Sequence, residues 1–239
     1  MIKALLCDLD GTLLHMDTDH FIEQYIRHLL PRIAHLVPPD RFAKQLMSST
    51  LAMVNNNDPA VTNQEAFFAD FFPKIGLSAD TLMPIFDDFY ENHFRHLHGF
   101  TRTVPEARAL LKAAVDRELG LAIVTNPVFP LSAIRQRVEW AGIGDFEFRL
   151  VTSYENMHFC KPLTQYYQEV VDLIGLRPEE CLMVGNDVDE DLVAADLGIK
   201  TFLVEDCLVN RRGVAPVADR VGKLADAVAF VRDGGIEGL

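Results

Sequence analysis

Two aspartates after an early apolar run are the first residues whose types and spacing could do chemistry. Asp8 and Asp10 stand two positions apart in Asp-x-Asp-Gly-Thr-Leu, directly after the run 3–7. Side chains at positions i and i+2 of a strand point the same way, and Gly11 permits a sharp turn. Two like charges this close need a cation. The motif therefore predicts a cation site, and a bound metal ion is an economical way to fill it.

Two later motifs offer groups that bind anions. Thr125 and Asn126 provide a hydroxyl, an amide and backbone N–H groups just before an expected helix, a combination that can hold an anion. Lys161 stands before Pro162, which on its own is an ordinary arrangement for a surface lysine at a helix start. Neither motif is specific alone, so their meaning depends on where the fold puts them.

A third late motif is unusually acidic. Asp187, Asp189 and Asp191 follow Gly185-Asn186, and the first and last of them are four residues apart. Capping of a helix N-terminus would explain one of these acids but not three in five residues. The motif predicts a second group of carboxylates at a helix start.

Short apolar runs place all these residues at one edge of a sheet. The runs alternate with segments of helical period, and they do not alternate in polarity, as expected for parallel strands buried on both faces. Ligands of such sheets collect beyond the carboxyl ends of the strands. We expect an α/β, doubly wound fold with strands at 3–7, 121–125, 148–152, 182–185 and 201–204, and helices near 104–118, 131–141, 163–174, 188–197 and 221–231.

The segment from about residue 16 to residue 100 breaks this alternation. It contains helix-period stretches at 21–36, 41–53, 64–73 and 80–96, and no convincing strand. We therefore expect an all-helical insertion at 16–100, between a core made of 1–15 and 101–239. Aromatics at helical spacing are most often packing residues. The insertion's own core is expected to contain Phe67, Phe68, Phe71, Phe72, Phe86 and Phe89.

Composition limits the partners. The chain has 239 residues with 22 Lys+Arg against 35 Asp+Glu, a net charge of −13. This field would repel nucleic acid and an anionic membrane surface, so neither is an expected partner. Arg211 and Arg212 lie in a polar loop and are expected to face solvent. The four isolated cysteines and the lack of a signal-like or membrane-spanning apolar stretch favour free thiols and a cytoplasmic location.

In their order and at these strand ends, the four motifs resemble those of the haloacid dehalogenase superfamily, most of whose members are phosphatases. The match runs through Asp8-x-Asp10-Gly-Thr, Thr125-Asn126, Lys161-Pro162 and Gly185-Asn186-Asp187-x-x-x-Asp191. It covers residues 1–15 and about 101–205, and the insertion falls where that superfamily has its helical cap. The resemblance implies a Rossmann-like sheet of order 5-4-1-2-3 with a mobile lid.

The resemblance also implies a role for each residue. Asp8 would attack phosphorus to form an aspartyl-phosphate, and Asp10 would protonate the leaving oxygen and then activate water. Mg²⁺ would bind Asp8, Asp187 and the backbone carbonyl of Asp10. Lys161 and Thr125 would hold the phosphoryl oxygens, helped by Asn126. The expected activity is Mg²⁺-dependent hydrolysis of a small phosphorylated metabolite.

Two other functions stay open, and a third is disfavoured. A sugar phosphomutase of the same superfamily shares both aspartates and the cap, and differs mainly in excluding water from the phosphoenzyme. A receiver-like phosphoacceptor module also surrounds an aspartate with acids and a lysine, although it needs no lid. Haloacid dehalogenases lack the second aspartate, so Asp10 argues against that activity. The substrate and the oligomeric state are not indicated.

The fourth motif departs from the commonest pattern of the superfamily, in which Asp directly follows Gly. Here Asn186 intervenes before Asp187. If the spacing of four to the next acid decides, Asp187 is the metal ligand and Asp191 supports the site. If the distance from Gly185 decides, Asn186 takes the ligand position. We favour Asp187, because an anionic oxygen neutralises Mg²⁺ better than an amide does and gains from the expected helix dipole.

Overall fold

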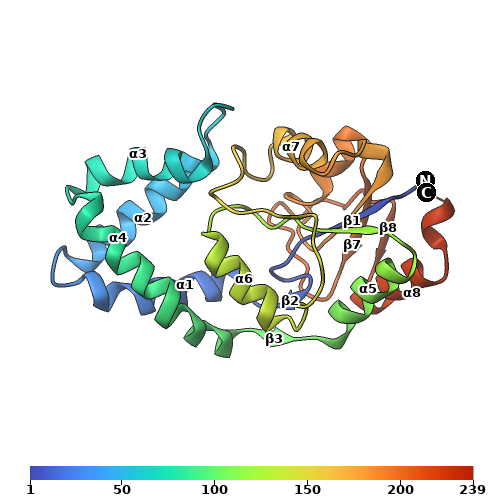
Figure 1. The fold of residues 1–239 in the computed structure, drawn as a ribbon, viewed down its shortest axis with the longest axis horizontal. Helices are drawn as coiled ribbons and strands as arrows, with labels where there is room; N and C mark the ends of the chain where they lie inside the picture. Colours follow the sequence, from blue (N-terminus) through green and yellow to red (C-terminus); the bar gives the residue numbers. More distant parts are fainter. Residues whose placement is uncertain (239) are drawn as a thin grey trace.

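A six-stranded parallel sheet forms the centre of the fold in the computed structural model, which describes residues 1–238 (Figure 1). Every neighbouring pair of strands in it is parallel. The predicted order of five strands is confirmed, and a sixth strand extends one edge. In spatial order the strands are β5 (Leu150–Val151), β4 (Gly120–Ile123), β1 (Ala4–Cys7), β6 (Cys181–Gly185), β7 (Lys200–Val204) and β8 (Arg220–Gly222).

The edge strand β8 corrects the sequence prediction, which placed residues 221–231 in one helix. Val221 pairs with Leu203 of β7, and α8 begins only afterwards, at Leu224–Arg232. The Asp226 carboxylate accepts the backbone N–H of Lys223 at 2.8 Å, which fixes the helix start. The predicted helix thus included the last two residues of β8, Val221 and Gly222.

Side chains alternate between the two buried faces of the sheet. Leu5 and Cys7 of β1 join one apolar cluster, and Ala4 and Leu6 join the other. Helices α5 (Pro105–Asp116), α6 (Leu131–Trp140) and α8 contribute to the first cluster, while α7 (Thr164–Ile174) contributes to the second. Helices on both faces make the sheet doubly wound, as predicted from the unbroken apolar strands.

A helical segment lies between two short strands that pair with each other. β2 (Leu14–His15) and β3 (Arg102–Thr103) are antiparallel, so the chain leaves the core and returns to it at one place (Figure 1). Between them lie α1 (Thr18–Ile33), α2 (Pro39–Val54), α3 (Asn63–Ile75), α4 (Ala79–Asp88), the π-helical turn η1 (Phe89–His93) and the 3₁₀ helix η2 (Phe94–Phe100). We call residues 18–100 the cap helices.

The apolar core of the cap helices is continuous with the core under the sheet, whereas the sequence suggested a core of their own. Phe42, Phe71 and Phe86 pack within the cap, with ring centroids of Phe42 and Phe71 5.7 Å apart. Tyr25 of α1 reaches Phe129 of the core at 5.2 Å. Because rings bridge the two parts, all the buried cap aromatics belong to the cluster that includes Leu5.

The cap also contacts the core through backbone hydrogen bonds at the start of α3. The N–H groups of Asn63 and Gln64 donate to the carbonyls of Met157 and Tyr154, both at 2.8 Å. The buried Asn63 amide donates to the carbonyl of Phe159 at 3.1 Å. The cap is therefore attached at α3 as well as at the β2–β3 pair, and the attachment at α3 was not predicted from the sequence.

The cysteines agree with the prediction of free thiols. Cys7, Cys160 and Cys181 are buried and Cys207 is half-buried, and none forms a disulfide. Burial raises the pKa of Cys160 and Cys181 to about 12, so these thiols stay protonated. Over residues 1–238, no helix is both long and apolar enough to cross a bilayer.

Phe42→Ala should lower the free energy of unfolding by about 3–5 kcal/mol, because it empties a fully buried position between aromatic rings. Leu51→Ala on the same helix is the control. Leu51 is 61% exposed, so its loss should change stability by less than about 0.5 kcal/mol. Urea unfolding of both variants measures the difference. Equal effects would contradict the described packing of α2.

Candidate active site

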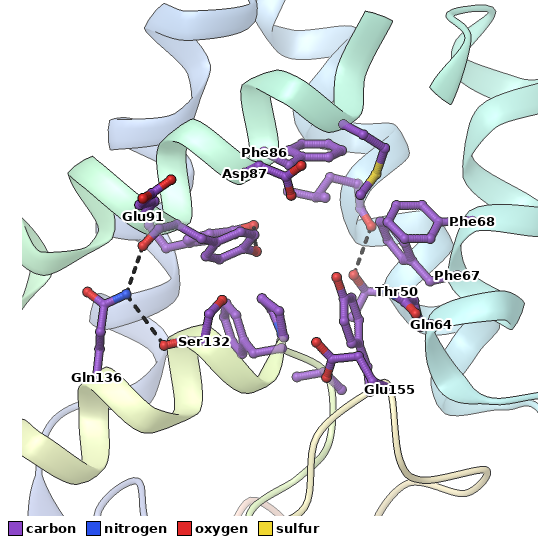
Figure 2. Close-up of a pocket in the computed structure, with 18 of the residues that line it drawn as sticks. Thr50, Gln64, Phe67, Phe68, Phe86, Asp87, Glu91, Ser132, Gln136 and Glu155 are labelled. Carbon is purple, nitrogen blue, oxygen red and sulfur yellow. Dashed lines mark hydrogen bonds between the residues drawn. The ribbon is translucent and has the colours of Figure 1, made fainter. Parts of the chain in front are cut away.

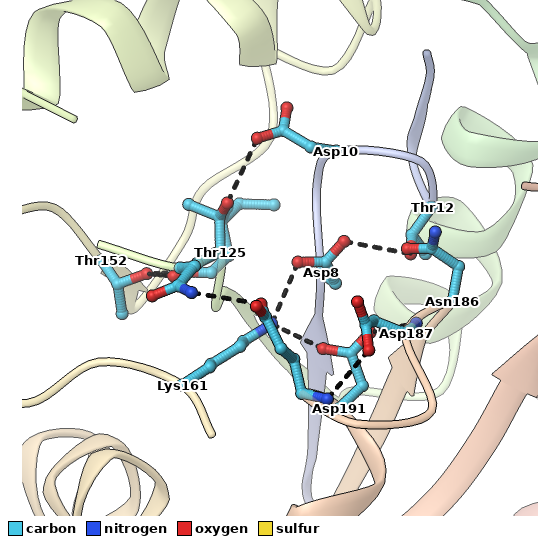
Figure 3. Close-up of polar contacts among 12 residues, drawn as sticks. Asp8, Asp10, Thr12, Thr125, Thr152, Lys161, Asn186, Asp187 and Asp191 are labelled. Atoms are coloured by element: carbon cyan, nitrogen blue, oxygen red, sulfur yellow. Dashed lines mark hydrogen bonds and ion pairs between the residues drawn. The ribbon is translucent and has the colours of Figure 1, made fainter. Parts of the chain in front are cut away.

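The loops after β1, β4 and β6 meet at the carboxyl edge of the sheet and form a pocket of about 350 Å³, which we call the acid pocket (Figure 3). Core and cap both line it, since Phe21 and Met47 of the cap helices join the residues at the strand ends. The expected strand-end site is therefore a real cavity. Seven of the eight residues predicted from the motifs line it: Asp8, Asp10, Thr125, Asn126, Asn186, Asp187 and Asp191.

The eighth predicted residue, Lys161, lies beneath the acid pocket and places a buried positive charge there. Its Nζ donates to Asp8 Oδ1 at 3.0 Å and to Asp191 Oδ1 at 2.6 Å, and the side chain is 1% exposed (Figure 3). Burial lowers the pKa of Lys161, but the charges of Asp191 and Asp8 outweigh it and hold the pKa well above its usual value. Lys161 is thus a permanent cation, not the surface lysine that its local sequence suggests.

Two glycines let the acidic segments approach each other. Gly11 has a φ of +90°, and a Cβ there would come within 2.5 Å of the Asn186 amide. At Gly185, a Cβ would lie 2.2 Å from the Asp191 carboxylate. A Cβ at Gly11 would displace the Asn186 side chain of the β6 loop, and a Cβ at Gly185 would displace the Asp191 side chain within that loop. The two glycines therefore leave room for Asn186 and Asp191 at the acid pocket.

Asp10 is held by an arginine that the sequence analysis did not identify. Arg137 Nη1 forms an ion pair with Asp10 Oδ2, and the Thr125 hydroxyl donates to the same oxygen at 3.4 Å. The other oxygen, Oδ1, is buried and has no hydrogen-bond partner among the described residues. One oxygen of Asp10 is therefore fixed, while the other is free to exchange a proton with a ligand.

Arg137 is 2% exposed and lines the acid pocket from α6. Its guanidinium carbon lies 4.7 Å from the centroid of the Phe129 ring, and its Nε and Nη2 have no partner among residues 1–238. A signal was present in the sequence: Arg137 falls on the apolar face of α6 with Ala133, Ile134 and Val138. A charged residue on such a face is a candidate for a buried role.

Thr125 and Asn126 lie in the acid pocket, in the loop before α6, and α6 starts at Leu131 as predicted. The first N–H of α6 donates to both oxygens of the Glu155 carboxylate at 3.0 Å. Glu155 thus caps the helix end that was expected to bind an anion. Asn126 Nδ2 donates to Glu190 at 3.1 Å, which leaves Asn126 Oδ1 unpaired among the described residues.

Asn186 and Asp187 point to different partners. Asn186 Oδ1 accepts the Thr12 hydroxyl at 2.8 Å and its Nδ2 donates to the Cys207 carbonyl at 2.6 Å, so the amide is engaged at both ends. Asp187 Oδ1 accepts the N–H groups of Asp189 and Glu190 at 2.8 and 3.0 Å. Its Oδ2 is bound only by a side chain from outside the loop.

That side chain is Arg211, whose Nη1 donates to Asp187 Oδ2 at 2.7 Å. Arg212 pairs with Asp189. Both arginines are more than half exposed, yet they bind the fourth motif, which corrects the prediction that they only face solvent. The predicted helix at 188–197 is also wrong in its first turn, because only the short 3₁₀ helix η4 (Leu192–Leu197) forms. Asp187 therefore gains nothing from an α-helix dipole.

The acid pocket holds more negative than positive groups. Burial raises the pKa of Asp8 and of Asp191, and it raises the pKa of Glu190 to about 7. Within residues 1–238, no three His, Cys, Asp or Glu side chains are preassembled around a metal position. The donor set nevertheless fits a hard cation, because the lining carboxylates of Asp8 and Asp187 supply oxygen only and the excess acid favours a bound positive charge.

With this geometry established, the family follows from a sequence comparison. Residues 2–198 match the family model described as haloacid dehalogenase-like hydrolase. The chain belongs to this family of hydrolases. The predicted resemblance and the prediction of an enzyme are both confirmed.

Among curated proteins, the chain is 26% identical over 194 residues to pyrophosphatase PpaX of Oceanobacillus iheyensis, covering 81% of this chain and 78% of that protein. It is 32% identical over 123 residues to the phosphoserine phosphatase of Thermus thermophilus, covering 51% and 48% of the two chains. Both relatives are named for removing phosphate groups.

Two solved structures show the same fold over almost the whole chain. A HAD phosphatase from Thermococcus onnurineus superposes with a TM-score of 0.59 at 20% identity, covering 97% of both chains. An L-2-haloacid dehalogenase from Xanthobacter autotrophicus superposes with a TM-score of 0.57 at 20% identity, covering 97% of this chain and 99% of that chain. At this identity the likeness establishes the fold.

Lys161→Met should lower the free energy of unfolding by about 3–5 kcal/mol at about pH 8 without divalent metal, because Asp8 and Asp191 lose their buried cation. The loss should shrink toward about pH 5. Burial raises the pKa of both carboxyls, so the folded variant binds more protons than the unfolded chain and regains stability as the pH falls. Urea unfolding at both pH values measures this.

The control for Lys161→Met is Lys112→Met on α5. Lys112 pairs with Asp116, and the two side chains are 70% and 60% exposed, so this variant should lose less than about 1 kcal/mol at either pH. Losses of equal size for the two variants would contradict the buried charge cluster.

Proposed function

We propose that this hydrolase is a Mg²⁺-dependent phosphatase that cleaves a small phosphoester through an aspartyl-phosphate intermediate. The observation that carries the proposal is the placement of Asp8 and Asp10 at the end of β1, with a buried lysine beneath Asp8 and an unpaired oxygen on Asp10. The names of the curated relatives support phosphate removal. A nucleophile, a proton donor and a cation within one pocket are what phosphoryl transfer requires.

Asp8 is the proposed nucleophile. One of its oxygens attacks phosphorus while the bond from phosphorus to the leaving oxygen breaks, and the phosphoryl group is then carried by the Asp8 carboxylate. Lys161 and the Thr12 hydroxyl, at 3.0 and 3.2 Å, hold the two carboxyl oxygens and orient them. Lys161 also places positive charge where the phosphoryl oxygens would bind, together with Thr125 and Asn126.

Asp10 is the proposed acid and base. In the first step, its carboxyl gives a proton to the leaving oxygen. In the second, the carboxylate takes a proton from water, whose oxygen attacks phosphorus and breaks the bond to Asp8, releasing inorganic phosphate. Arg137 keeps one oxygen of Asp10 in place, which supports the use of the unpaired Oδ1 for the proton transfers.

Asp8, Asp187 and the main-chain carbonyl of Asp10 would hold Mg²⁺. When bound, the ion supplies positive charge that neutralises the phosphoryl oxygens and the crowded carboxylates. The hydrogen bonds support Asp187 over Asn186 as the ligand, because both ends of the Asn186 amide are engaged. Among the described residues, Asp187 Oδ2 is bound by the half-exposed Arg211 alone.

The observations favour hydrolysis over the other two functions. The curated relatives are named as phosphatases, not as mutases. A phosphoacceptor module has no use for cap residues such as Phe21 and Met47, which line the acid pocket. No observation therefore favours a second candidate function.

We expect the protein to hydrolyse 4-nitrophenyl phosphate in the presence of Mg²⁺, to lose this activity in EDTA and to regain it when Mg²⁺ is restored. Asp8→Asn should reduce the rate by at least about a thousandfold, since an amide has nearly the same shape but is no nucleophile. Release of nitrophenol measures both effects.

Asp189→Asn is the matched control for Asp8→Asn. It makes the same chemical change on an acid of the β6 loop that does not line the acid pocket, so its rate should stay near that of the wild type. Full activity in EDTA, or a wild-type rate for Asp8→Asn, would rule out the proposed mechanism.

Two variants test whether Asp187 or Asn186 is the metal ligand in the fourth motif. Asp187→Asn should raise the Mg²⁺ concentration for half-maximal activity by at least about tenfold, because it removes an anionic ligand. Asn186→Ala should change that concentration by less than about threefold, although loss of its two hydrogen bonds should lower stability. The opposite ranking in a Mg²⁺ titration would make Asn186 the ligand.

A further inference from the structure

A second cavity, of about 530 Å³, adjoins the acid pocket between the cap helices and the loops that follow β4 and β5 (Figure 2). We call it the aromatic cavity. Its lining includes Ile22, Met47, Val128 and Phe129, and these four residues also line the acid pocket. The two cavities therefore share apolar lining residues and lie next to each other.

Aromatic rings dominate the second cavity. In addition to Phe129, the lining includes Tyr25, Phe67, Phe68, Phe86, Tyr90 and Tyr154. The Tyr25 and Tyr90 hydroxyls bond each other at 2.8 Å, and burial raises the pKa of Tyr25 to about 12, so this pair stays neutral. Such a wall fits a flat apolar group, because rings gain from edge and face contacts with other rings as well as from burial.

The charges of the aromatic cavity exclude an anion. Within residues 1–238, no lysine, arginine or histidine lines it, and its charged lining residues are Asp87, Glu91 and Glu155. Glu155 is occupied by the Leu131 N–H. Asp87 and Glu91 are exposed at the rim, four residues apart, and form no ion pair among the described residues (Figure 2). A phosphate or carboxylate here would lose its hydration without gaining a cation.

The wall between the cavities contains a link to the proposed proton donor. The Phe129 ring contacts the Arg137 guanidinium, which in turn pairs with Asp10. A leaving oxygen protonated by Asp10 would lie in the acid pocket, which Phe129 and Arg137 also line. The aromatic cavity, which shares Phe129 with that pocket, is the adjoining space for the group attached to that oxygen.

We propose that the aromatic cavity binds the leaving group of the phosphoester, and that this group is an apolar, aromatic alcohol without negative charge. This inference rests on the proposed phosphatase function and adds the substrate class. Inorganic pyrophosphate and carboxylated phosphoesters would place an anion in a cavity whose described lining has acidic side chains and no cationic one. They are poor substrates by the same argument.

Three esters of similar leaving-group reactivity test the substrate class: ethyl phosphate, 2-phenylethyl phosphate and 2-carboxyethyl phosphate. With Mg²⁺ present, kcat/KM for the phenyl compound should exceed that for ethyl phosphate by at least about tenfold, because a buried ring is added. The carboxylate compound should be a poorer substrate than ethyl phosphate. Equal values for the phenyl and ethyl esters, or a preference for the carboxylate, would overturn the inference.

Phe68→Ala tests whether the aromatic cavity is responsible. It should raise KM for 2-phenylethyl phosphate by about three- to tenfold, which is the contribution of one aromatic contact, and raise KM for ethyl phosphate by a smaller factor. The matched control is Phe72→Ala. Phe72 stacks on Phe68 at 4.9 Å and is partly buried on the same helix, but it does not line the cavity. Equal effects of the two variants on both esters would overturn the inference.

Failure of the proposed phosphatase function and failure of the proposed substrate class would give different results. If none of the three esters is hydrolysed and Asp8→Asn changes nothing, the phosphatase function itself is wrong. If all three are hydrolysed in a manner that depends on Mg²⁺ and Asp8 but the carboxylate ester is preferred, only the assignment of the aromatic cavity is wrong.

Discussion

The ammonium group of Lys161 lies between the carboxylates of Asp8 and Asp191, and the rest of the site is arranged around this buried charge. One cation for two buried acids leaves the pocket short of positive charge, as the raised pKa of both carboxyls reflects. The glycines at 11 and 185 leave space for the side chains of Asn186 and Asp191 beside this charge. Mg²⁺ and a phosphoryl group are the pair of ligands that this imbalance suits, since the ion corrects the charge and the phosphoryl group binds to it.

The fold separates the chemistry from the recognition of the leaving group. Strand ends of the core supply the charged groups, while cap helices and two core loops supply rings. Phe129 and Arg137 connect the two, because the ring forms part of both cavities and the guanidinium pairs with Asp10. Backbone hydrogen bonds from Asn63 and Gln64 join α3 to the core loop that carries Tyr154. The side of the aromatic cavity formed by α3 and Tyr154 is therefore held by main-chain contacts as well as by side-chain packing.

The sequence predicted the sheet and most of the acid pocket, because strand ends and short motifs are local features. Asp8 and Asp10 follow from spacing alone, and the parallel sheet then brings Asp187 near them. What the sequence did not predict depends on tertiary contacts. Arg137 reaches the pocket from the apolar face of a helix, Arg211 reaches Asp187 across 24 positions, and Glu155 caps a helix that starts 24 positions earlier. The aromatic cavity is assembled from six separate segments, so periodicity could identify its rings only as core.

The central claim is that Asp8 carries the phosphoryl group during turnover. The most direct measurement is mass spectrometry of peptides from enzyme quenched in acid while it hydrolyses an excess of 4-nitrophenyl phosphate with Mg²⁺. The mechanism predicts a peptide containing Asp8 that is heavier by one phosphoryl group and whose label is lost on treatment with hydroxylamine, as expected for an acyl phosphate. Turnover with no such label, or with the phosphoryl group on another residue, would contradict it.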